Sequence, residues 1–245
     1  MNSKFLRFLT LFLQVICLAV IVGVCVYGIV VNDEWSVSGP FIETVVRASV
    51  LFLLTISYYK TSVSNFNPGN PFIMLFMLFM TIVELKILSV FTELTGWSIL
   101  PARVSVRLHL FSQLMVYFLL AGYAINYQNN DHSAVTRFML FGITGCLFLS
   151  IMIPATQDIT GVWTLRAPYL LVTIYCSVSV LCNLILAFSE STKLGTLRHI
   201  STVMMLLGNY AMIYDNPTIA LIGSCTFVVG AFISMILTLR NSVIL

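Results

Sequence analysis

Charged residues are scarce in this 245-residue chain: Asp, Glu, Lys and Arg make up 9% of it, whereas a soluble domain has about 25%. Hydrophobic residues account for 59%, and the mean hydropathy is +1.01. So few charges can neither cover the surface of a soluble enzyme, nor form a basic nucleic-acid surface, nor keep a chain disordered. The composition therefore predicts an integral membrane protein whose main partner is the lipid bilayer, and excludes nucleic acid as a partner.

Motifs for metals, cofactors and covalent catalysis are also missing. The six cysteines form no C-x-x-C pair and lie in apolar runs, so we expect reduced thiols that pack as small residues. The sequence has no H-E-x-x-H, G-x-S-x-G, P-loop or G-x-G-x-x-G motif. Of its three histidines, His132 and His199 are expected at the inner surface, distant from His109, which argues against a His-rich metal site. We therefore predict no metal and no cofactor, and no motif points to a known family.

Eight apolar runs are each long enough for a membrane-spanning helix, which needs about 20 residues. The runs lie at about 6–31, 41–60, 71–92, 104–127, 137–154, 167–188, 197–214 and 217–239. The loops between them are short, so we expect the whole chain to form one all-α transmembrane bundle of eight helices. The run at 197–214 is the weakest, because Gly208 and Asn209 interrupt it. Without it, the alternative is a bundle of seven spans.

The distribution of charge orients these spans. Lys4 and Arg7 precede the first span, and cytoplasmic segments of membrane proteins carry an excess of Lys and Arg. With eight spans, the side of the N-terminus holds seven of the twelve basic residues and two of the nine acidic ones, a net charge of +5. The other side carries −2, which restores the total of +3. We therefore expect both termini in the cytoplasm, in a plasma membrane or bacterial inner membrane.

A few ionisable residues lie inside the predicted spans, where each costs at least roughly 2.5–3.5 kcal/mol on insertion scales and often marks function. Glu43 and Arg47 are four residues apart, so they share a helical face and can pair. Glu84 lies roughly 20 Å along the third span, past the bilayer centre. Its side chain is too short to reach the interface, so it needs a partner, a proton or water. Glu84 is therefore the strongest single candidate for a functional residue.

Most of these polar residues fall in the outer halves of spans two to four and in the outer loops. Cations slightly exceed carboxylates among them, which suits a small anionic or zwitterionic ligand. We therefore predict an outward-facing ligand pocket; the structural alternative is a buried ion-pair network that fixes helix packing. The candidate ligand-binding residues are Glu43, Arg47, Glu84, Lys86, Trp97, Arg107, His109, Gln113, Trp163 and Arg166.

Three hypotheses for function follow. The first is a membrane sensor or accessory subunit that binds a small polar or anionic ligand and signals through a membrane or cytoplasmic protein partner. The second is a small-solute carrier or channel, for which few polar residues extend the path to the inner side: Thr55, Ser57, Asn126 and Asn183. The third is an intramembrane enzyme that uses Glu84 and His109 for acid–base chemistry. The first is favoured, because the charges cluster on one side of the membrane and we expect no separate soluble domain.

Overall fold

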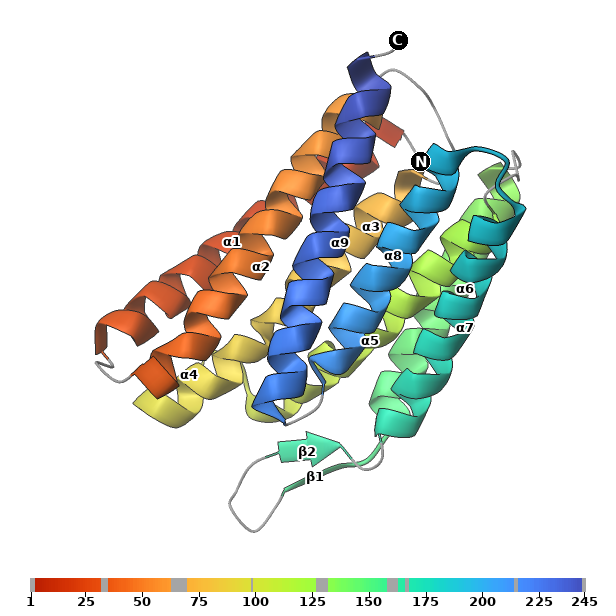
Figure 1. Ribbon diagram of the computed structural model, residues 1–245. Helices are drawn as coiled ribbons and strands as arrows, with labels where there is room; N and C mark the ends of the chain where they lie inside the picture. The colour runs from red at the N-terminus through yellow and green to blue at the C-terminus, as the bar shows by residue number, and fades with distance from the viewer. Residues whose placement is uncertain are drawn as a thin grey trace.

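A computed structural model of the chain describes residues 3–31, 35–62, 70–97, 99–126, 132–157, 163–165, 168–213 and 216–243. Within these residues the backbone is almost entirely helical, and the helices run up and down side by side (Figure 1). The sequence did not predict one feature, an antiparallel hairpin of β1 (Ala155–Gln157) and β2 (Trp163–Leu165). This hairpin lies at one end of the bundle, the hairpin end. At the other, the terminal end, α1 begins and α9 ends.

Each predicted apolar run corresponds to helical structure, which confirms the helical bundle. The helices are α1 (Ser3–Val31), α2 (Trp35–Ser62), α3 (Asn70–Val83), η1 (Glu84–Lys86), α4 (Ile87–Thr95), α5 (Ala102–Ile125), α6 (His132–Met152), α7 (Pro168–Ser189), α8 (Lys193–Ala211) and α9 (Pro217–Val243). The third predicted span stays one helical segment, in which the short 3-10 turn η1 lies between α3 and α4.

Seven helical segments among the described residues are long and apolar enough to cross a membrane. Their outward surfaces are also apolar: Phe141 of α6 is 77% exposed and Phe188 of α7 is 88% exposed. Large aromatic side chains on the surface are expected where lipid, rather than water, surrounds the protein. These features are consistent with a multi-pass membrane protein.

Helix α8 is not one of these seven segments, because it is less apolar than they are. Its polar residues Arg198, Thr202 and Asn209 are spaced by four and seven positions, so they share one face of the helix. Thr202 is 6% exposed and Asn209 is 1% exposed, so this face turns into the bundle. The polarity that made 197–214 the weakest predicted span therefore belongs to the interior of the protein.

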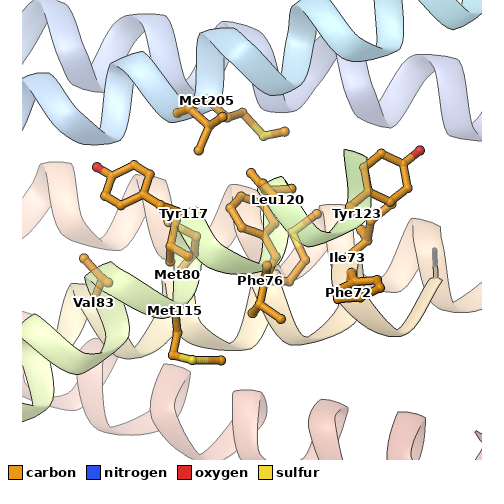
Figure 2. Packing of buried hydrophobic residues seen from close by; sticks show 14 of the residues in the cluster. Phe72, Ile73, Phe76, Met80, Val83, Met115, Tyr117, Leu120, Tyr123 and Met205 are labelled. Carbon is orange, nitrogen blue, oxygen red and sulfur yellow. The ribbon is translucent and has the colours of Figure 1, made fainter. Parts of the chain in front are cut away.

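The largest core cluster is built around α3 and α5. Phe76 of α3 and Tyr117 of α5 are among its fully buried side chains. In Figure 2, Tyr117, Leu120 and Tyr123 extend from α5 toward α8, where Met205 lies. Long side chains therefore fill the space between α5 and α8, and this is where buried polar groups enter the core.

Candidate functional site

Arg47 of α2 is the centre of a buried charge network in the hairpin half of the bundle. Its Nε donates to Oε1 of Glu84 at 2.9 Å, and its Nη2 donates to Oε2 of Glu84 at 3.0 Å. Its Nη1 donates to Oγ of Ser224 at 2.7 Å and to Oε2 of Glu43 at 3.3 Å. Nη2 also donates to Oγ1 of Thr44 at 3.3 Å. The network joins α2, η1 and α9, and we call it the Arg47 network.

The turn η1 places Glu84 within reach of Arg47. A 3-10 turn inside a longer helix often marks a hinge or a functional position. Glu84 is the first residue of the turn and is 1% exposed, so its carboxylate is buried inside the bundle. The partner that the sequence required for Glu84 is thus Arg47, and the expected pairing of Glu43 with Arg47 is also confirmed.

The Arg47 guanidinium makes five hydrogen bonds, as many as it has N–H groups. A ligand could bind this group only by displacing one of these partners. For Arg47 itself, the geometry favours the structural alternative, a network that fixes helix packing. The side chain of Glu43 differs from the rest because it is 40% exposed, so the network is accessible at its Glu43 side.

Lys86 and His109 lie near the Arg47 network. The His109 ring hydrogen-bonds with the backbone of Val83 and is within electrostatic range of Lys86 and Glu84. Lys86 is in turn within electrostatic range of Glu43. Nδ1 of His109 is buried without a hydrogen-bond partner, and Lys86 forms no ion pair in the described part of the chain. These two side chains therefore keep polar groups that a ligand could engage.

Gln113 belongs to a different polar contact. Its Oε1 accepts a hydrogen bond from Nδ2 of Asn209 at 2.9 Å, and the same Nδ2 donates to the Tyr117 hydroxyl at 3.0 Å. Asn183 likewise donates across helices, to the carbonyl of Leu120 at 3.2 Å. Asn183 and Asn209 therefore form hydrogen bonds between helices, as polar side chains inside membrane bundles commonly do.

The other predicted site residues are not joined to the Arg47 network by a described contact. Trp97, just beyond α4, is 74% exposed. Arg107 is half-buried on α5, and its Nε has no hydrogen-bond partner among the described residues. The side chain of Trp163 and the whole of Arg166 lie outside the part that the structure describes, so their roles remain predictions.

Polar groups also meet in the terminal half of the bundle, for which the sequence offers few polar candidates. Thr55 and Ser57, two of the residues considered there, donate to carbonyls of their own helix. A small cavity instead brings together polar side chains of α2, α5, α8 and α9. Those side chains are Tyr58, Tyr123, Arg198, Thr202 and Ser234. The shared face of Arg198 and Thr202 on α8 was the sequence signal that could have indicated this cavity.

Comparison with known protein families and with curated protein sequences finds no match to this chain. Among the described residues, no three His, Cys, Asp or Glu side chains come together as a metal site. The six cysteines are free thiols, as expected. A functional assignment therefore rests on the geometry of the polar groups inside the bundle.

Proposed function

We propose that this chain is a multi-pass membrane protein that binds a small zwitterionic or anionic ligand beside the Arg47 network and acts as a sensor or accessory subunit. The observation that carries the proposal is the short 3-10 turn η1 inside the third span, which places two charged residues within the bundle. Glu84, the first residue of this turn, forms a buried ion pair with Arg47, and Lys86, its last residue, is a cation without an ion pair among the described residues. A 3-10 stretch within a longer helix often marks a functional position, and charged residues inside a membrane span often mark a functional site.

The charges at this position suit a ligand with one charge of each sign. Glu43 presents a partly exposed carboxylate, and Lys86 lies within its electrostatic range. An ammonium group would bind at Glu43, and an acidic group would bind at Lys86, with Nδ1 of His109 as a further polar contact. Catalysis by Glu84 gains less support, because both of its carboxylate oxygens accept N–H groups of Arg47.

The signal would pass through the Arg47 network to a partner protein. Glu43 contacts Arg47 directly, and Arg47 contacts both Glu84 and Ser224. A ligand ammonium that competes for Glu43 would therefore change the packing of α2 against η1 and α9. Such a change in helix packing is the kind of two-state element that a partner in the membrane or cytoplasm can read.

We place eight crossings in this architecture, with both termini in the cytoplasm of a plasma or bacterial inner membrane. Helix α8 has 19 residues, a length of about 28 Å that matches the hydrocarbon core. It runs along the bundle beside α9 (Figure 1), and its polar face is turned to the interior. The hairpin end is then the outer side, which puts the Arg47 network in the outer half.

Ligand binding to the purified protein tests the site. We expect a small zwitterion such as glycine or taurine to bind, and Lys86→Met to weaken that binding about tenfold or more, because a charge-assisted contact is lost. Isothermal titration calorimetry in detergent measures the affinity. Arg137→Gln is the matched control, since Arg137 is exposed at the terminal end of α6 and contacts Ser133. Equal binding by the Lys86→Met variant would refute this site.

A small-solute carrier is the second candidate, and the polar face of α8 favours it. Arg198, Thr202 and Asn209 extend polar groups from the terminal half toward the Gln113 contact. Ser224 of the Arg47 network then contacts Met212, directly after α8. Polar side chains therefore follow one helix through most of the bundle, as a solute path requires.

Flux through proteoliposomes distinguishes the carrier from the sensor. If the chain is a carrier, labelled glycine or taurine enters vesicles that contain it, and Asn209→Leu reduces the rate by removing the polar group midway along α8. The control is Thr226→Ala, because Thr226 donates to a carbonyl of its own helix, α9. Binding without flux supports the sensor, whereas flux that survives Asn209→Leu argues against the α8 path.

A further inference from the structure

The cavity in the terminal half of the bundle is a second polar site, separate from the Arg47 network. Tyr58 of α2, Tyr123 of α5 and Ser234 of α9 line it together with Arg198 and Thr202 of α8. Its apolar wall comes from Phe76 and Met77 of α3, Leu120 of α5 and Met205 of α8. Five helices therefore contribute to one partly open cavity that the proposed ligand site does not use.

The size of the cavity restricts what it can hold. The space open to the centre of a water-sized sphere is about 10 Å³, which is about the room that one water molecule needs. A molecule of several atoms does not fit without movement of the helices. A single water or a monatomic ion of similar size does fit.

The chemistry of the lining favours an anion. Arg198 is the charged residue of the lining, and none of the residues that line the cavity is acidic. The Tyr58 hydroxyl and Oγ of Ser234 are 3.2 Å apart and share one hydrogen bond, so one of the two hydroxyl protons remains free to donate. A guanidinium has five N–H groups, so Arg198 can hold another partner and an anion at the same time.

From these features we infer that the cavity binds a single halide ion, such as chloride, between Arg198 and the hydroxyl groups of Tyr58 and Ser234. The apolar wall disfavours a polyvalent anion, because a second charge would be buried without compensation. Tyr58 and Arg198 are both partly exposed, so the site lies close to the protein surface at the terminal end. This inference does not depend on the proposed ligand at Lys86.

Chloride itself is the probe. Purified protein is heated in sodium chloride and in sodium gluconate at equal ionic strength, and the chloride dissociation constant is obtained from the rise in melting temperature with concentration. We expect chloride to stabilise the protein relative to gluconate. Arg198→Gln should raise the dissociation constant about tenfold or more, because hydrogen bonds to an ion are the stronger kind.

Two further variants keep the test decisive if Arg198→Gln fails to fold. Tyr58→Phe and Ser234→Ala each remove one hydroxyl and little volume, and the double variant should lose most of the chloride response. Arg137→Gln and Lys86→Met should keep the full response, which separates this site from general charge effects and from the proposed ligand site. Bromide in a crystal would give an anomalous peak beside Arg198. The inference is overturned if the protein is equally stable in chloride and gluconate. It is also overturned if the cavity shows no anomalous peak from bromide and holds only water.

Discussion

Replacing Arg47 with methionine is expected to destabilise the protein by about 3–5 kcal/mol, because it leaves the carboxylate of Glu84 buried without a counter-charge. Glu84 is 1% exposed and receives two N–H groups from Arg47. No other basic residue forms an ion pair with Glu84 within the described chain. The free energy of unfolding, measured by denaturant titration in mixed micelles, reports the loss.

A double-mutant cycle separates the ion pair from the volume that is lost. In the single variant Glu84→Met, the guanidinium of Arg47 keeps only Glu43, Thr44 and Ser224 as partners. This variant should therefore also lower the free energy of unfolding. The double variant, with both residues replaced by Met, should lose much less than the sum of the two, because a buried ion pair and a well-packed apolar pair often have similar stability. Additive losses would show that the two side chains are not coupled.

Glu43→Gln is the matched control in the same network. Its side chain is 40% exposed and its contact with Arg47 is 3.3 Å long, so its removal should cost at most about 1 kcal/mol. A loss as large as that of Arg47→Met would mean that Glu43, and not Glu84, neutralises the guanidinium. The comparison therefore ranks the two carboxylates within one network.

The local part of this network could be predicted from the sequence, whereas its long-range part could not. Glu43 and Arg47 are one helical turn apart, so helix geometry alone brings them together. Arg47 and Glu84 are separated by 37 positions, and Arg47 and Ser224 by 177. Only the packing of α2, η1 and α9 decides those contacts. The high cost of a buried charge showed that Glu84 needs a partner, but it did not identify which one.

The same limit explains the outcome for α8. Apolar runs were enough to place eight helices, because lipid demands long apolar segments. Hydropathy does not say which face of a helix meets lipid. The polar residues of α8 therefore made it a weak candidate for a membrane span. In the structure, Asn209 donates hydrogen bonds to Gln113 and Tyr117 inside the bundle. The cavity beside Arg198 was missed for that reason.

Gly208→Ala is expected to destabilise the protein by about 1–3 kcal/mol, because α8 and α9 pack too closely there for a methyl group. A Cβ atom at Gly208 would lie 2.6 Å from the backbone nitrogen of Phe227 and 2.7 Å from the carbonyl oxygen of Gly223. Both are backbone atoms, so no side-chain rotation can relieve the overlap, and the two helices must separate. Small residues permit this kind of close approach in membrane bundles.

Gly145→Ala is the matched control, since a Cβ atom there, in the interior of α6, would have nothing within 4 Å. It should be neutral or stabilise the protein by up to about 1 kcal/mol, because alanine favours a helix more than glycine does. Thermal unfolding in detergent compares the two variants. Equal effects at Gly208 and Gly145 would contradict the close contact.

The second glycine at this crossing makes the test specific to the helix pair. A Cβ atom at Gly223 would lie 2.7 Å from the carbonyl oxygen of Gly208 and 2.8 Å from Cβ of Ala211. Gly223→Ala should therefore also destabilise the protein. Once one methyl group has separated α8 from α9, the second meets less overlap, so the double variant should lose less than the sum of the single losses. Such non-additivity would locate the strain between the two helices, since strain within each helix would simply add.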